Sequence, residues 1–325
     1  MEPLTVEQLF KETRKHLKLE LLNNKASFKK LIDEQDLNRP GLALSGFVDV
    51  FTFKRVQIVG NTEIQFLKTM TRRERISALK KVMNFDIPCI IITEGNEPPD
   101  SFLDCASESA ISVLRTPMST TRMMHLLSDY MDDKFAPSVT LHGSLVDVYG
   151  VGVLFTGRSG IGKSEIALDL VERGHRLVAD DIVHVARMAE GVLIGSPSEL
   201  LEHHMEIRGL GIVDVQSVFG IRSIRHRKRV EVAVQLEEWD EAQSYERIGL
   251  DDSFTAILDV QVPTVRLPIF PGKNITVIAE TLALTQILKV HGYHPAKRFN
   301  ERLIERMKKK GDSSQTIDYM GRDYE

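Results

Sequence analysis

The chain is poor in cysteine, has no long apolar run and has no excess of basic charge. Its 325 residues include two cysteines, Cys89 and Cys105, which form no C-x-x-C pair, so they suggest neither a disulfide framework nor a zinc site. No apolar run approaches membrane-spanning length, and the N-terminal MEPLTVEQLF lacks the basic start and apolar centre of a secretory signal. We therefore expect a soluble, cytoplasmic protein that does not associate with a membrane.

The charge balance excludes one further class of protein. The formal net charge is -4, whereas a general nucleic-acid binder is normally basic. The composition is ordinary for a globular protein, with 42% hydrophobic and 27% charged residues. This hydrophobic content is enough for a substantial core. A length of 325 residues predicts two domains, or one large domain with an appendage.

A glycine-rich stretch is the most informative motif. It reads Gly157, Arg158, Ser159, Gly160, Ile161, Gly162, Lys163 and Ser164, and it fits G-x-x-x-x-G-K-[ST] at every fixed position. Residues 151–156 before it predict a buried strand, and residues 164–173 after it have helical spacing. An ordinary glycine-rich turn does not require such neighbours. Strand, loop and helix together predict a site where backbone N–H groups and a helix N-terminus hold a nucleoside triphosphate.

Two side chains of this motif have expected roles. Lys163 would reach the outer phosphates, and the Ser164 hydroxyl would bind the Mg²⁺ that bridges them. The motif alone does not define a reaction, because many unrelated enzymes use it.

Alternating patterns along the chain predict an α/β fold in two parts. In the first third, strands are expected at 87–93 and 110–114, and helices from near residue 6, at 71–82 and at 120–131. Thr5 and Gln8 fit a capping box for the first helix. Such alternation predicts a small parallel sheet, and no catalytic constellation occurs there. We expect a non-catalytic N-terminal α/β domain at 1–133, ending in a polar stretch before Pro137, and a catalytic domain at 134–325.

The expected catalytic domain is rich in strand patterns. Strands are predicted at 139–143, 145–150, 151–156, 176–179, 182–186, 192–194 and 230–236, and helices at 275–288 and 296–310. Asp180 and Asp181 follow a strand, at the edge where α/β sheets place ligands. A carboxylate there can hold magnesium or accept a proton, or it can make local hydrogen bonds in a turn. Adjacent residues at a strand end point to opposite sides, so one of the two is expected to face the phosphates.

Two further residues are candidates near the loop. His142 precedes the predicted loop and is either a half-buried packing residue or a group that tunes a carboxylate or contacts phosphate. Glu206 follows His203 and His204 with a spacing that matches no zinc pattern, although an oxygen ligand there suits magnesium. Gly209 and Gly211 predict a flexible or tightly turned loop after it.

Several basic residues have two interpretations. Arg247 and Lys273 either neutralise phosphate charge or are surface cations. The run 222–229, RSIRHRKR, is either a solvated hairpin or a patch that receives an acidic or phosphorylated partner.

Taken together, these stretches resemble the bacterial HPr kinase/phosphorylase family across both expected domains. The resemblance rests on His142 with Gly143, on 157–165 and on 177–181. It rests further on the family's signature loop, matched by Met205, Glu206, Ile207, Arg208, Gly209, Leu210, Gly211, Ile212, Val213 and Asp214. The loop that the family associates with dephosphorylation is matched by Pro268, Ile269, Phe270, Pro271, Gly272 and Lys273.

The resemblance implies a bifunctional enzyme. ATP or pyrophosphate would phosphorylate a serine of HPr, the phosphocarrier protein of the sugar phosphotransferase system. Inorganic phosphate would attack the phosphoserine in the reverse reaction and yield pyrophosphate. The implied active-site residues are His142, Lys163, Asp181 and Arg247, with Ser164 and Glu206 as magnesium ligands.

The resemblance also implies features that no spacing reveals. The C-terminal part would be a P-loop kinase domain whose mixed, β-rich core resembles phosphoenolpyruvate carboxykinase. The enzyme would form a homohexamer, respond to fructose 1,6-bisphosphate and phosphate, and regulate carbon catabolite repression and sugar uptake. Two alternatives stay open: a P-loop kinase of a small molecule, and a nucleotide-dependent regulatory or scaffold protein.

Overall fold

The computed structural model describes residues 4–240, 253–270 and 272–312. The chain divides into two compact units, Met1–Ala136 and Pro137–Glu325. Each unit is described by itself. Within the described residues, no helix combines the length and apolar character needed to cross a membrane.

The first unit is built on a five-stranded sheet in the order β1-β5-β4-β3-β2. Its strands are β1 (Glu20–Leu21), β2 (Leu37–Asn38), β3 (Val56–Val59), β4 (Cys89–Ile92) and β5 (Ser112–Arg115). Its helices are α1 (Val6–Leu17), α2 (Gly41–Leu44), α3 (Asn61–Thr69), α4 (Arg72–Met83), α5 (Asp100–Glu108) and α6 (Thr120–Phe135). β2 to β5 pair in parallel, as predicted, and β1 adds an antiparallel edge.

Apolar strands place a separate core on each face of this sheet. In β4, Ile90 and Ile92 join the core that contains Phe102, whereas Cys89 and Ile91 join the core that contains Leu9. This division follows from the strand period, because successive side chains point to opposite faces. Both cysteines of the chain are free and buried, which agrees with the prediction of no disulfide.

Local capping starts α1 where the sequence predicts. The Thr5 hydroxyl accepts a hydrogen bond from the Gln8 N–H at 3.2 Å, and the Gln8 side chain accepts one from the Thr5 N–H at 2.9 Å. This capping box satisfies backbone donors that the first helical turn leaves unpaired.

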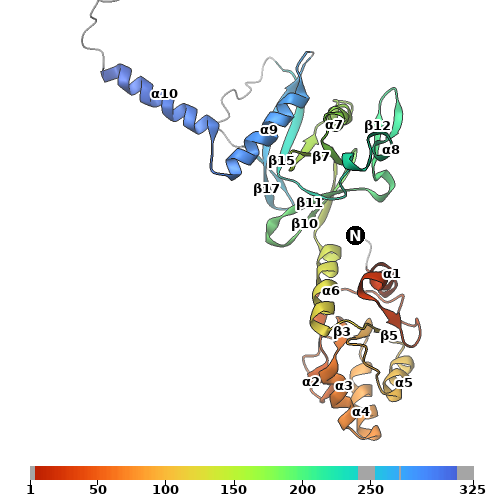
Figure 1. The fold of residues 1–325 in the computed structure, drawn as a ribbon. Coiled ribbons are helices and arrows are strands. Elements are labelled where there is room, and N and C mark those ends of the chain that lie inside the picture. Colours follow the sequence, from red (N-terminus) through yellow and green to blue (C-terminus); the bar gives the residue numbers. More distant parts are fainter. Residues whose placement is uncertain (1–3, 241–252, 271, 313–325) are drawn as a thin grey trace, which may run out of the picture. The chain divides into compact units, whose positions relative to one another are not determined.

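The second unit contains two sheets and one separate hairpin (Figure 1). The six-stranded sheet has the order β16-β17-β15-β8-β7-β9, and the four-stranded sheet has the order β14-β11-β10-β6. The strands are β6 (Ser138–His142), β7 (Ser144–Val148), β8 (Val151–Thr156), β9 (Arg176–Ala179), β10 (Ile182–Arg187), β11 (Leu193–Pro197), β12 (His204–Ile207), β13 (Gly211–Asp214), β14 (Lys228–Arg229), β15 (Val232–Glu238), β16 (Ser253–Ile257) and β17 (Val260–Ile269). The helices are α7 (Lys163–Glu172), α8 (Val215–Phe219), α9 (Ile275–Val290) and α10 (Pro295–Asp312), with 3-10 turns η1 (Ala189–Gly191), η2 (Glu199–Leu201) and η3 (Ile221–Ser223).

The six-stranded sheet lies between α7 and α9 on one face and the smaller sheet on the other. Its residues Val153 and Phe155 share a core with Ile166 of α7 and Ala279 of α9. On the other face, Leu154 shares a core with residues of β10 and β11. The mixed α/β fold class is therefore confirmed for this unit.

Of the two forms predicted around Gly209 and Gly211, the structure has the tight turn, which joins β12 to β13 and leaves Glu206 paired opposite Ile212. One local prediction differs from the structure. The basic run 222–229 is not a hairpin of its own, because its last two residues form β14 and pair with β11. This difference arises because the partner strand is distant in the sequence.

Candidate active site

The glycine-rich loop is curved around a lysine side chain. β8 leads into it and α7 follows, so the predicted order of strand, loop and helix is confirmed. Gly157, Gly160 and Gly162 have φ values of 144°, 79° and 102°, which side-chain-bearing residues rarely adopt. The Lys163 ammonium donates hydrogen bonds of 3.1 Å to the carbonyl oxygens of Gly157 and Arg158. The loop thus wraps the lysine at the N-terminus of α7.

The ends of β15 and β17 lie beside this loop. β8, β15 and β17 run parallel, so their carboxyl ends share one sheet edge. A Cβ on Gly157 would stand 2.7 Å from the carbonyl oxygen of Leu236 in β15, which excludes any side chain. Arg158 pairs with Glu238, which is in register with Ile269 of β17. The described part of the 268–273 segment therefore begins at the same edge as the loop.

His142 and Asp181 are brought together by two neighbouring crossings between the sheets. The chain passes from β6 to β7 at Gly143 and from β9 to β10 at residues 180–181. β6 pairs with β10, which places His142 in register with Ile182. The His142 Nδ1 atom consequently lies 3.8 Å from the Asp181 Oδ1 atom, and the two side chains are 81% and 56% exposed. Both groups can reach a ligand from solvent.

Asp180 differs from Asp181 in its burial and in its hydrogen bonding. It is 2% exposed, and its Oδ1 accepts a hydrogen bond from the Ser144 hydroxyl at 2.5 Å. Its other oxygen, Oδ2, is buried and has no hydrogen-bond partner among the described residues. Burial raises the pKa of Asp180, although hydrogen bonds from the Ser144 and Ser164 hydroxyls act in the opposite direction. The sequence predicts the aspartate pair but neither the burial of Asp180 nor its hydrogen bond with Ser144.

The hairpin β12–β13 reaches the loop from another side. Glu206 is exposed on β12, while the adjacent Met205 is 1% exposed in the core. The Arg208 guanidinium lies 2.5–2.9 Å from the place that a Cβ on Gly160 would occupy. The glycine therefore permits the close approach of an arginine to the loop, a contact that the sequence pattern did not single out.

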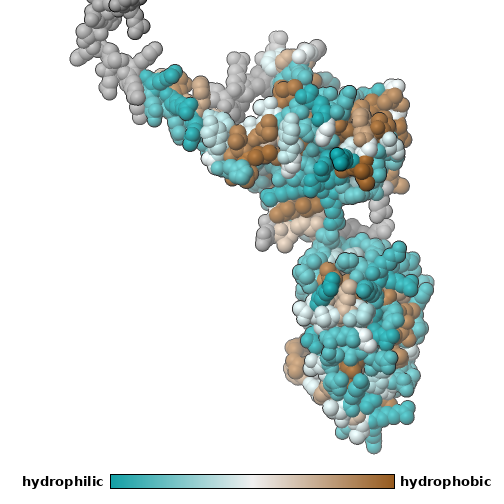
Figure 2. Space-filling view, viewed as in Figure 1, coloured by the Kyte–Doolittle hydropathy of each residue, from teal (hydrophilic) through white to brown (hydrophobic). Residues whose placement is uncertain are grey.

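Other predicted residues either have local roles of their own or lie outside the described part of the chain. Asp214 caps α8 by accepting a hydrogen bond from the Ser217 N–H at 3.0 Å, and Ser217 holds the pKa of Asp214 below its ordinary value. Leu210 and Ile212 are 69% and 74% exposed, and Figure 2 shows apolar side chains gathered over β12 and α8. Arg247 and Pro271 lie outside the described residues.

The end of the 268–273 segment carries a shielded cation. The Lys273 ammonium donates to the Pro268 carbonyl oxygen at 2.9 Å and lies 5.1 Å from the centre of the Phe270 ring. Burial lowers the pKa of Lys273.

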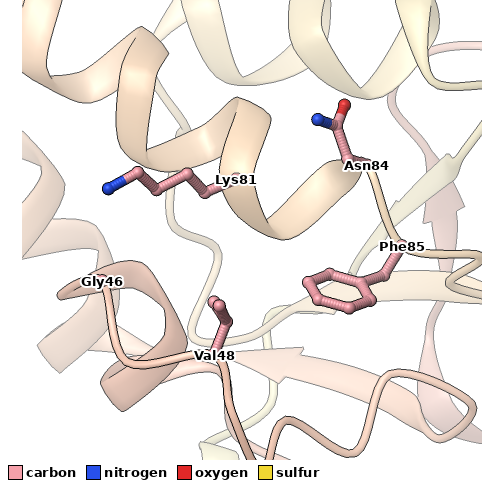
Figure 3. A pocket seen from close by; sticks show the side chains of 5 residues that line it. All are labelled: Gly46, Val48, Lys81, Asn84 and Phe85. Carbon is pink, nitrogen blue, oxygen red and sulfur yellow. The ribbon is translucent and has the colours of Figure 1, made fainter.

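A cavity of about 390 Å³ lies in the first unit and has a different lining (Figure 3). Gly46, Val48, Lys81, Asn84 and Phe85 surround it. None of these residues belongs to the predicted phosphate or magnesium site. The candidate active site is instead the exposed sheet edge of the second unit.

Two family models match the chain and together span nearly all of it. The model of the HPr Serine kinase N terminus matches residues 4–131, and that of the HPr Serine kinase C-terminal domain matches residues 133–303.

Named relatives agree with these matches. The HPr kinase/phosphorylase of Chloroherpeton thalassium is 47% identical over 317 residues, covering 96% of this chain and 93% of the relative. The HPr kinase/phosphorylase of Prosthecochloris aestuarii is 49% identical over 330 residues, covering 99% and 96%. A solved structure of the Hpr(Ser) kinase/phosphatase from Coxiella burnetii is 33% identical and covers 50% of this chain and 99% of that chain, with a TM-score of 0.44.

The fold and these matches define a two-domain kinase of mixed α/β architecture. The chain belongs to the HPr kinase/phosphorylase family.

Proposed function

We propose that this chain phosphorylates a serine of HPr, with ATP or pyrophosphate as donor, and dephosphorylates phosphoseryl-HPr by phosphorolysis. The observation that carries the proposal is the loop curved around Lys163 in the same unit as the exposed Asp181–His142 pair. The names of relatives that are 47% and 49% identical support HPr as the substrate.

The loop supplies the binding site for a polyphosphate, as in P-loop kinases. Its N–H groups and the N-terminus of α7 favour an anion. Lys163 now donates to two carbonyl oxygens, and it would exchange these bonds for phosphate oxygens when a nucleotide binds. Phosphoryl transfer depends mainly on such positioning and charge neutralisation, so these groups provide much of the catalysis.

The oxygen groups around Ser164 fit Mg²⁺. The buried Asp180 Oδ2 has no hydrogen-bond partner among the described residues. The Ser164 hydroxyl is close enough to the Asp180 carboxyl group to lower its pKa. Magnesium prefers carboxylate, hydroxyl and water oxygens, which Ser164, Asp180 and the exposed Glu206 can provide. When bound, the ion would neutralise charge on the phosphates.

Asp181 is the proposed acid and base. In the forward reaction the serine Oγ–P bond forms, the bond from that phosphorus to the leaving group (ADP from ATP, phosphate from pyrophosphate) breaks, and the serine proton passes to Asp181. In the reverse reaction a phosphate oxygen attacks the same phosphorus, the Oγ–P bond breaks, Asp181 returns the proton and pyrophosphate forms. His142, 3.8 Å away, would help to position this carboxylate or the phosphate that it faces. Arg247 would add positive charge, by likeness to the family.

The remaining features are proposed on the same likeness. They are a non-catalytic N-terminal domain at 1–133, a catalytic P-loop domain at 134–325 with a core like that of phosphoenolpyruvate carboxykinase, and a cytoplasmic homohexamer. Control by fructose 1,6-bisphosphate and phosphate, and a role in carbon catabolite repression, complete the proposal.

The test is to incubate the protein with HPr, Mg²⁺ and ATP labelled on its terminal phosphate. We expect label on an HPr serine, followed by labelled pyrophosphate when inorganic phosphate is added. Lys163→Ala should reduce both reactions by about 10³-fold or more, because it removes a cation that contacts phosphate in each direction. Lys68→Ala, an exposed position in the first unit, is the matched control and should keep both. Label on a small acceptor instead of HPr would identify a metabolite kinase, and ATP binding without any product would identify a regulatory protein.

A further inference from the structure

A second group of ligand-type side chains lies at the base of the hairpin β12–β13. Glu202, His203 and His226 each offer one ligand atom, and these atoms all lie within 4.8 Å of one another. The Glu202 Oε1 atom is 2.8 Å from the His226 Nδ1 atom and 3.5 Å from the His203 Nε2 atom. The two imidazole ring centres are 5.2 Å apart. The sequence pattern does not predict this group, because His226 follows η3 and is distant in the sequence from Glu202 and His203.

One atom of this group lacks the partner that its burial demands. The His203 Nε2 atom is buried and makes no hydrogen bond within the part of the chain that the structure describes. Buried polar atoms normally have a partner, because an unpaired one loses its interaction with water without compensation. The neighbouring His204, in contrast, has a hydrogen-bond partner, since its Nδ1 atom lies 2.7 Å from the Glu202 carbonyl oxygen. The Nε2 atom of His203 is therefore available to donate its lone pair to a ligand.

We propose that Glu202, His203 and His226 bind a Zn²⁺ ion. Two imidazoles and one carboxylate are a common zinc donor set that leaves the fourth position to water. Zinc bonds of about 2.0–2.2 Å in a tetrahedron need roughly 3.4 Å between ligand atoms. The two separations from Glu202 are 2.8 and 3.5 Å, and no pair of ligand atoms is more than 4.8 Å apart. The nitrogen donors separate this site from the proposed magnesium site, whose donors are all oxygens.

The ion would fix the hairpin to the following segment. His203 directly precedes β12, and its carbonyl oxygen accepts the N–H of Val215, the first residue of α8, at 2.9 Å. His226 lies between η3 and β14. A metal shared by these two residues joins the root of the hairpin, which carries Glu206 and Arg208, to the basic run. This site does not depend on which phosphoryl acceptor the enzyme uses.

The experiment titrates metal-free full-length protein with Zn²⁺ against a chromophoric chelator, in excess Mg²⁺. We expect one tightly bound zinc ion per chain and a higher Tm with zinc. Co²⁺ in its place should give the intense visible absorption of a tetrahedral site. His226→Gln and Glu202→Gln should each weaken zinc binding by about 100-fold and remove that absorption. The His226 side chain is 73% exposed, so its replacement leaves the core intact.

Two control variants separate this site from other metal binding. His125→Gln removes an exposed histidine 3.8 Å from the Asp129 carboxylate, a pair that belongs to no three-ligand cluster of the described residues, and should bind zinc like the wild type. Glu206→Gln removes a proposed magnesium ligand and should also bind zinc normally. The proposal is overturned if the wild type binds no zinc in excess Mg²⁺, or if His226→Gln binds it as tightly as the wild type does.

Discussion

The backbone N–H of Gly143 donates a hydrogen bond of 3.1 Å to the carbonyl oxygen of Asp181. This bond joins the two places where the chain passes between the sheets of the second unit. A Cβ on Gly143 would stand 2.5 Å from the carbonyl oxygen of Phe155, closer than real contacts allow. The neighbourhood of His142 and Asp181 therefore depends on a residue without a side chain.

Gly143→Ala should destabilise the protein. The added methyl group must displace the backbone of β8, and overpacking of this kind costs about 2 kcal/mol, or roughly 4–8 °C in Tm. Ser138→Ala, at an exposed position of β6, is the control and should leave Tm nearly unchanged. Thermal unfolding followed by circular dichroism measures both. Equal Tm values for wild type and Gly143→Ala would mean that the crossing has room that the structure does not show.

The adjacent aspartates should respond differently to the same substitution. Burial raises the pKa of Asp180 above its ordinary 3.8, so the folded state disfavours its charge and loses stability as pH rises through that raised value. Asp180→Asn removes this cost and can still accept the Ser144 hydrogen bond. We expect a higher Tm than that of the wild type at pH 7, together with a loss of HPr phosphorylation of about 10²-fold or more.

Asp181→Asn is the matched comparison for that variant. Its side chain is 56% exposed, so Tm should change little while phosphorylation falls by a similar factor because the proposed base is gone. Calorimetry and the labelled-ATP assay on both variants check the pair. A Tm gain in Asp181→Asn, or none in Asp180→Asn, would contradict the assigned environments.

Local patterns were sufficient to predict the phosphate-loop region and much of the first unit. The apolar run before Gly157 and the helical spacing after Lys163 lie within one short stretch, and both elements form as expected. The capping box of α1 and the parallel pairing of β3, β4 and β5 likewise follow from neighbouring residues and from the alternation of strands and helices.

The remaining features depend on contacts that the sequence does not display. β8 pairs with β15, from beyond the hairpin, and this pairing adds to the φ of 144° as a reason why Gly157 tolerates no side chain. The glycines at 209 and 211 have φ values of 83° and 93° and shape the β12–β13 hairpin, although the same residues are equally typical of an irregular loop. The buried Asp180 likewise takes its hydrogen-bond donor, the Ser144 hydroxyl, from another strand.

Glu280 should make stability depend on pH in acid. It accepts hydrogen bonds from the Arg173 guanidinium at 2.6 and 3.1 Å and lies 3.0 Å from the His175 Nε2 atom, which ties α9 to the end of α7. Arg173, followed by His175, lowers the pKa of Glu280 from 4.5 to about 2, despite the opposing effect of burial. A depressed pKa adds stability that is complete above pH 4.5 and is lost as pH falls toward 2.

Glu280→Gln should therefore be less stable than the wild type at neutral pH, and the difference should shrink between pH 4.5 and 2. Thermal unfolding of both proteins at several pH values in that range measures it. Glu172→Gln, at an exposed position of α7, should show no such convergence. A difference that stays constant down to pH 2 would contradict the pairing.

Lys273→Ala should impair phosphorolysis about 10-fold more than phosphorylation. Phosphorolysis brings inorganic phosphate against a phosphoserine, so two anions must approach each other without a leaving nucleotide already in place, and a nearby cation lowers that repulsion. The Lys273 ammonium is partly shielded by Phe270 and Pro268, and a shielded cation acts more strongly on an approaching phosphate than one in water. Initial rates in both directions, with Arg266→Ala on the exposed side of β17 as the control, measure the ratio. Equal losses in the two directions would leave this segment with a general role in binding phosphate and none specific to dephosphorylation.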